Sequence, residues 1–126
     1  MTDWDPSDLD RIGTAEELRI SSHRVDGSLR PAIPIWHVAV DGALYVRSAY
    51  GPGNGWFRRA TQAGTGRVEA DGAGADVAFE RLADDDARHA ALDAAFAEKY
   101  ARFPSYVAPL LTEEARTATL RVMPAA

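Results

Sequence analysis

The sequence has no cysteine among its 126 residues. This absence excludes a disulfide framework, thiolate-bound metals, iron–sulfur clusters and a thiol nucleophile. No run of about eighteen apolar residues occurs, so we expect no membrane span. The first residues, MTDWDP, are acidic where a secretory signal would be basic and then apolar, and we therefore expect a cytoplasmic protein.

Lysine is also scarce, because Lys99 is the only one in the chain. The 14 Lys plus Arg residues face 19 Asp plus Glu residues, and the net charge of −5 argues against a nucleic-acid-binding protein. Apolar residues make up 46% of the chain and charged residues 26%, which is the balance of a folded globular protein. At this length we expect a single domain over residues 1–126.

The positive charge is concentrated in one stretch of the chain. Residues 43–67 contain arginines and no acidic residue, whereas the sequence on either side is acidic. The arginines of this stretch are Arg47, Arg58, Arg59 and Arg67. A basic stretch inside an acidic chain predicts a site for a small anion. The alternative is that these side chains simply face water.

The pattern of apolar and polar residues predicts an α+β fold. Six strands are expected, at residues 17–25, 33–40, 44–49, 64–70, 76–82 and 115–123. Helices are expected at residues 7–13, 56–62 and 84–103, with a short piece at 105–111. Turn signals at Asp41-Gly42 and Asp71-Gly72 predict antiparallel hairpins. Together these elements favour a six-stranded antiparallel split β-barrel with flanking helices.

No cluster of His, Asp and Glu has metal-ligand spacing, so no metal site is predicted. His37 lies on the most apolar predicted strand, where it is either a proton donor or ligand, or a hydrogen-bonded structural residue. His89 is expected to face solvent. The run Asp84 to Asp86 is interpreted as the start of a helix rather than a magnesium site, because acids stabilise the positive end of a helix.

One arrangement of residues suits a phosphate group. A predicted strand carrying Arg47 and Ser48 leads into a glycine-rich turn, and a helix then begins near Gly55 with Arg58 and Arg59 in its first turns. A helix start offers unpaired N–H groups, and guanidinium groups donate two hydrogen bonds at once. The alternative is an ordinary strand-to-helix connection with solvated arginines.

The segment 33–72 resembles the core of the FMN-binding split β-barrel flavin and deazaflavin oxidoreductases, and more narrowly the deazaflavin-dependent nitroreductases. The residues that match this pattern are Arg47-Ser48, Gly51 to Gly55, Trp56-Phe57 and Val68. The tail, residues 102–124, is similar to the closing helix and last strand of the same proteins. Within this group the chain is most similar to an uncharacterised family of small bacterial proteins.

The resemblance implies a bound FMN or deazaflavin F-420 that transfers a hydride to a small organic acceptor. It places the cofactor-binding contacts at Arg47, Ser48, Gly53, Asn54, Gly55, Arg58 and Arg59. Tyr106 is the implied tyrosine on the substrate side and our first candidate for a catalytic proton donor, with His37 the second. The resemblance also implies a homodimer.

The chain departs from the nitroreductase pattern at two places. The loop before Trp56 lacks the usual lysine, and Leu110-Leu111 stand where a second tyrosine is expected. Two alternatives therefore remain. One is a non-catalytic protein of the same barrel that binds a flavin, haem or similar ligand. The other is a structural dimer whose basic stretch contacts an acidic protein.

Overall fold

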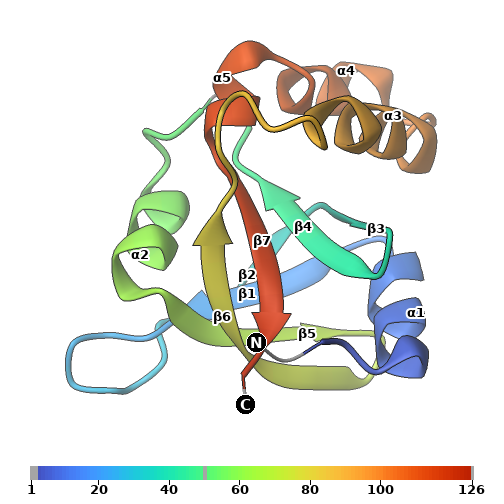
Figure 1. Ribbon diagram of the computed structural model, residues 1–126. Coiled ribbons are helices and arrows are strands. Elements are labelled where there is room, and N and C mark those ends of the chain that lie inside the picture. The colour runs from blue at the N-terminus through green and yellow to red at the C-terminus, as the bar shows by residue number, and fades with distance from the viewer. Residues whose placement is uncertain (1–2, 50, 126) are drawn as a thin grey trace.

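An antiparallel sheet curls into a nearly closed barrel with helices around it in the computed structural model, which describes residues 3–49 and 51–125 (Figure 1). The strands of this described part are β1 (Leu18–Ser22), β2 (Ile33–Ile35), β3 (His37–Val40), β4 (Ala43–Arg47), β5 (Thr65–Ala70), β6 (Ala73–Arg81) and β7 (Thr119–Pro124). The helices are α1 (Pro6–Thr14), α2 (Gly55–Ala63), α3 (His89–Lys99), α4 (Pro104–Val107), α5 (Glu113–Thr117) and the short 3-10 helix η1 (Ala108–Leu110). None of the described helices has both the length and the apolar character needed to cross a bilayer.

The strand order across the sheet is β2-β1-β5-β6-β7-β4-β3. The α+β class and the antiparallel barrel are confirmed, but the expected number of six strands is wrong because the described residues form seven. The run 33–40, expected as one strand, divides at Trp36. Its first half pairs with β1 and its second half with β4, so the two edges of the sheet are joined by this one residue. Pro34, which has no N–H to donate, lies on an edge strand, where proline is tolerated.

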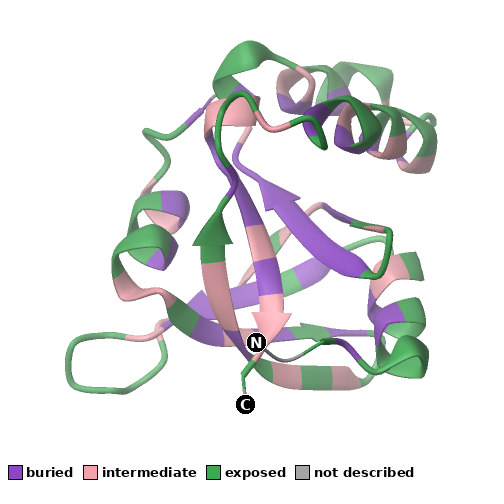
Figure 2. Cartoon of the chain, viewed as in Figure 1, coloured by how far each residue is buried: buried purple, intermediate pink, exposed green. Residues whose placement is uncertain are grey.

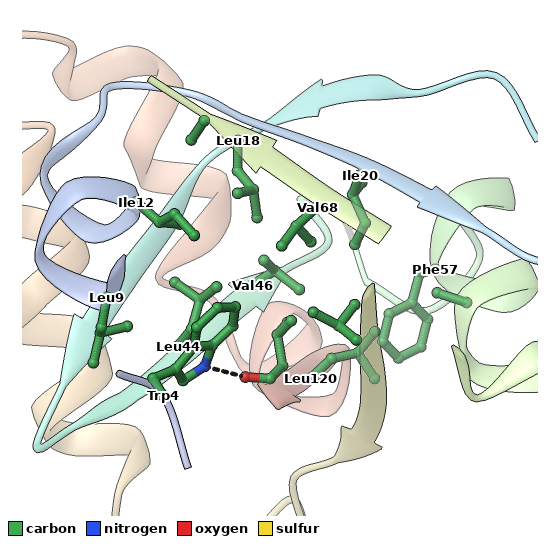
Figure 3. Packing of buried hydrophobic residues seen from close by; sticks show 14 of the residues in the cluster. Trp4, Leu9, Ile12, Leu18, Ile20, Leu44, Val46, Phe57, Val68 and Leu120 are labelled. Atoms are coloured by element: carbon green, nitrogen blue, oxygen red, sulfur yellow. Dashed lines mark hydrogen bonds between the residues drawn. The ribbon is translucent and has the colours of Figure 1, made fainter. Parts of the chain in front are cut away.

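Apolar side chains fill the barrel interior, and α1 covers one end of it (Figure 3). Leu9 and Ile12 on the buried face of α1 join this core. The indole Nε1 of Trp4 donates to the carbonyl of Val122 at 2.9 Å, which fastens the N-terminal segment to β7. The side chain of Asp5 caps α1 by accepting from two backbone N–H groups.

A second apolar core lies outside the barrel, between strands β3 and β4 and helix α3. The predicted alternation along β4 is confirmed, since Leu44 and Val46 face the interior core whereas Tyr45 faces the outer one. Figure 2 shows β4 buried along its length, as two covered faces require. Helix α3 begins at His89, so the expected start at residue 84 is wrong. The carboxylate of Asp86 instead accepts from the backbone N–H of Arg88 in the preceding turn.

Helix α2 packs against the barrel beside β1, β5 and β6. Phe57 and Ala60 form its buried face. The helix ends at Gly64, whose φ of 73° is the left-handed conformation and whose N–H bonds back to the carbonyl of Ala60. The chain then enters β5 at once, and this short connection holds α2 close to β1 and to the loop at 23–31.

Candidate functional site

A basic groove runs between α2 on one side and β1 with the 23–31 loop on the other. It consists of an inner hollow of about 190 Å³ and an outer hollow of about 540 Å³, which share Arg30 and Arg59. The inner hollow is also lined by Ile20, Ser21, Ser22, Ile33 and Trp56. The outer hollow is also lined by His23, Arg24, Gln62 and Thr65.

The lining of this groove is positively charged. No carboxylate lines either hollow, and Arg24, Arg30 and Arg59 take part in no ion pair within the described residues. The Nε of Arg30 is shielded from solvent and has no hydrogen-bond partner in the described part of the chain. A buried donor without an acceptor is costly, and neighbouring cations repel one another. The groove therefore favours an anionic ligand.

The first turn of α2 adds positive potential near the inner hollow. The N-cap residue Asn54 makes no side-chain capping bond, because its Nδ2 donates to the carbonyl of Ala49 at 3.0 Å. No acid lies in the first turn. Arg59 folds back over Gly55, and a Cβ at position 55 would lie 2.8 Å from Nη1 of Arg59. A guanidinium beside the positive end of a helix is unfavourable unless an anion joins them.

The structure divides the predicted phosphate contacts. Arg59 lines both hollows, and Asn54 and Gly55 begin the helix that carries it. Gly53 lies in the preceding loop, where a Cβ would meet no atom within 4 Å. Arg58 is exposed and lines neither hollow. The other two predicted contacts, Arg47 on β4 and Ser48 just after it, line neither hollow.

Ser48 is buried directly after β4. Its backbone N–H donates to the carbonyl of Ala118 at 3.0 Å, and its hydroxyl contacts the carbonyl of Ala49 at 3.3 Å. Ser48 therefore helps to join the end of β4 to the start of β7, and it lines neither hollow of the basic groove.

Arg47 is fully enclosed by protein. Its Nε donates to Thr119 Oγ1 at 3.0 Å, its Nη1 to the Asp93 carboxylate, and its Nη2 to His89 Nδ1 at 3.0 Å. A fourth contact joins Nη1 to the carbonyl of Leu110. Burial lowers the pKa of Arg47, and the Asp93 carboxylate opposes that shift. Each guanidinium nitrogen already has a protein acceptor, so the cofactor contact expected at Arg47 does not fit this geometry, and our proposed site omits it.

His89 was expected to face solvent and is instead buried. Its Nε2–H donates to the carbonyl of Ala83 at 2.7 Å, and its Nδ1 accepts from Arg47, which fixes the tautomer. The signal that could have found this contact is the spacing between His89 and Asp93. Residues four apart lie on one face of a helix, and both contact the same arginine.

His37, the second candidate proton donor, is also a buried structural residue. Its Nε2–H donates to the carbonyl of Ile12 at 2.6 Å, and its backbone N–H donates to the Tyr100 hydroxyl at 3.0 Å. Lys99 Nζ donates to the His37 carbonyl and to the carbonyl of Gly13, each at 2.8 Å. Burial, with the nearby charge of Lys99, lowers the pKa of His37 to about 4. The residue ties α1 to β3 and lines neither hollow of the basic groove.

The buried imidazole predicts a loss of stability in mild acid. As the pH falls from about 7.5 to about 4.5, the unfolded chain binds a proton on His37 that the folded protein does not, so the unfolding free energy falls by about 2–3 kcal/mol. Urea unfolding at the two pH values measures this loss, and a His37→Gln variant should lack this part of it. An NMR titration of the wild type with a midpoint near the ordinary value of 6.5 would contradict the prediction.

Tyr106, the first candidate proton donor, lies far from the basic groove. Its side chain is 74% exposed on α4 and lines neither hollow. Figure 1 shows α4 beside α3 at the opposite side of the barrel from the 23–31 loop. Within one chain, the structure therefore does not bring either candidate donor to the groove.

Comparison with known protein families identifies the family of this chain. The model of one family matches residues 8–122, from α1 to β7, and that family is described as "uncharacterized protein conserved in bacteria (DUF2255)". The chain belongs to the DUF2255 family. The matched range of DUF2255 includes both walls of the basic groove. No curated protein matches the sequence.

Solved structures share the fold of this DUF2255 protein at low sequence identity. An FAD-binding protein from Mesorhizobium loti is 16% identical with a TM-score of 0.61, covering 98% of this chain and 91% of its own. An F420-H2-dependent reductase is 15% identical with a TM-score of 0.61, covering 85% and 92%. The heme storage protein HutZ from Vibrio cholerae is 11% identical with a TM-score of 0.63, covering 100% and 92%. These likenesses show that this chain shares the fold of these proteins.

Proposed function

We propose that this protein binds an anionic flavin-type cofactor, FMN or the deazaflavin F-420, in the basic groove and transfers a hydride from it to a small organic acceptor. The observation that carries the proposal is the set of guanidinium groups in the groove, which face no carboxylate among the described residues. A phosphate or phosphodiester is the acceptor that such donors fit best.

The residues of the inner hollow fit the phosphate-bearing part of such a cofactor. Arg59 and the unpartnered Nε of Arg30 would hold the anion, and the buried residues Ser21 and Ser22 line the same hollow. Ile33 and Trp56 supply apolar surface at the same place. A bound reduced flavin or deazaflavin supplies the hydride itself, so the protein has only to bind it, orient it and exclude water.

The comparisons support a flavin-type ligand without fixing which one. Among the proteins of the same fold are an FAD-binding protein and an F420-H2-dependent reductase. The likeness of the segment 33–72 to the deazaflavin-dependent nitroreductases points the same way. We further propose that the protein is a homodimer, as that likeness implies. We also propose a cytoplasmic location, as expected from the sequence.

A second candidate function is binding without turnover. It is favoured by the positions of Tyr106 and His37, because neither candidate proton donor lines the groove. HutZ, a heme storage protein, has the same fold. A protein that binds FMN, F-420 or haem and shows no turnover with NAD(P)H, reduced F-420 or a redox dye would be of this kind.

The proposal predicts different effects for two adjacent arginines of α2. Arg59→Gln should weaken the binding of FMN and F-420 about ten- to one hundred-fold, because it removes a charge-assisted hydrogen bond from the groove. Fluorescence quenching on titration measures both affinities.

Arg58→Gln is the matched control, since it removes the same charge one residue earlier and outside the groove. It should change either affinity by less than about three-fold, because exposed charges act weakly at a distance. Equal losses for the two variants would contradict the site. No micromolar affinity of the wild type for FMN, F-420 or FAD would contradict the proposed function itself.

A further inference from the structure

We infer that the outer hollow holds the distal part of an elongated ligand, so that the preferred cofactor carries two or more anionic groups along its tail rather than one terminal phosphate. This inference rests on the proposed function, since it concerns the same groove. The shared chemistry is a pyrophosphate, or a phosphodiester followed by carboxylates, which FAD and F-420 respectively provide.

The two hollows form one continuous path. Arg30 and Arg59 border both of them, so a ligand anchored in the inner hollow meets the outer one directly. The outer hollow, at about 540 Å³, is more than twice the size of the inner one at about 190 Å³. The inner hollow alone is smaller than most ligand sites, whereas the outer hollow lies within their range, so a ligand anchored in the inner hollow must extend into the outer one.

Arg24 gives the outer hollow its own anion-binding group. Its Nη1 donates to the carbonyl of Leu29 at 3.1 Å and to Ser28 Oγ at 3.3 Å, which fixes the side chain against its loop. The Asp26 carboxylate accepts from the Ser28 N–H at 2.9 Å and so holds the turn of the same loop. Nε and Nη2 of Arg24 keep their donors free of protein partners within the described residues. A side chain held in this way loses little entropy on binding.

The distribution of charge also favours more than one anion. Arg24 lies on the loop wall, Arg59 on the wall formed by α2, and Arg30 borders both hollows. The Asp26 carboxylate on the same loop attracts Arg24, but a single terminal phosphate at Arg30 and Arg59 would leave Nε and Nη2 of Arg24 without an acceptor. A second anionic group further along the tail would reach it. His23 supports that wall, because its Nδ1 lies 2.9 Å from Thr65 Oγ1 at the start of β5.

The test combines three ligands with three variants. FMN, FAD and F-420 are titrated into the wild type, Arg24→Gln, Arg59→Gln and Arg19→Gln, with fluorescence quenching as the readout. Arg19→Gln is the control for Arg24→Gln, because it removes an exposed charge from β1 outside the groove. The substituted side chains are exposed, so the variants should keep the wild-type unfolding free energy, which urea titration checks.

We expect at least one of FAD and F-420 to bind about ten-fold more tightly than FMN, and the tighter of the two identifies the source of the second anion. Arg24→Gln should weaken that ligand about ten-fold and FMN less than two-fold, whereas Arg59→Gln should weaken all that bind. Equal affinities, or an equal effect of Arg24→Gln on FMN and on the longer ligands, would overturn this inference and leave the proposed function standing. Absence of binding by all three would overturn both.

Discussion

Replacing Arg47 by methionine is expected to lower the free energy of unfolding by about 3–5 kcal/mol, the largest effect of any single substitution considered for this protein. The guanidinium is fully buried and joins strand β4 to Asp93 of α3 and to Thr119 of β7. Among the described residues, its removal leaves the Asp93 carboxylate with only Arg116 as an ionic partner. Urea denaturation of the variant and the wild type at neutral pH measures the difference.

Arg58→Met is the matched control for this substitution. It removes the same charged group from an exposed position of α2, where no ion pair is broken within the described residues, and should change the unfolding free energy by less than about 0.5 kcal/mol. A loss below about 1 kcal/mol for Arg47→Met would contradict the structural role given to Arg47. In that case Arg47 would again be a candidate for binding the cofactor.

Leu120→Ala is expected to lower the unfolding free energy by about 2–5 kcal/mol. Leu120 is completely buried in the barrel interior, where it packs with Leu44 and Val46 of the neighbouring strand (Figure 3). Truncation removes apolar contacts and leaves a cavity that the closed sheet cannot easily collapse around. The same urea titration provides the measurement.

Met123→Ala gives the comparison on the same strand. Met123 is only partly buried and lies outside the interior core, so the expected loss is below about 1.5 kcal/mol. The contrast between these two positions tests the register of β7. If Met123→Ala proved the more damaging change, the assignment of inward and outward faces along this strand would be wrong.

Local signals in the sequence predicted much of this fold. The alternation along residues 44–49 predicted the two faces of β4, and the two expected hairpin turns, at Asp41-Gly42 and Asp71-Gly72, have positive φ. The division at Trp36 could not be predicted in this way. Whether an apolar run is one strand or two depends on which distant strands pair with each half, and β1 and β4 lie next to opposite edges of the sheet.

The candidate site was predicted only at Arg59 and the helix start that carries it. The stretch 43–67 contains no acid, but the fold brings acids to it from elsewhere. Asp93 from α3 pairs with Arg47, and Asp76 from β6 pairs with Arg67. Arg24 and Arg30, which complete the groove, lie in a loop whose closeness to α2 is a tertiary feature. Charge counted along the chain cannot detect it.

The single-residue link at Trp36 bears on how the protein avoids assembling into fibrils. Exposed strand edges recruit further strands from other molecules, and short or proline-bearing edges resist this. The two edge strands here have three and four residues, and one contains Pro34. Trp36 stacks on Tyr100 of the outer core, with ring centroids 4.0 Å apart, which anchors the residue that links the two edges. The seam of the barrel therefore offers little template for cross-β growth, even at high concentration.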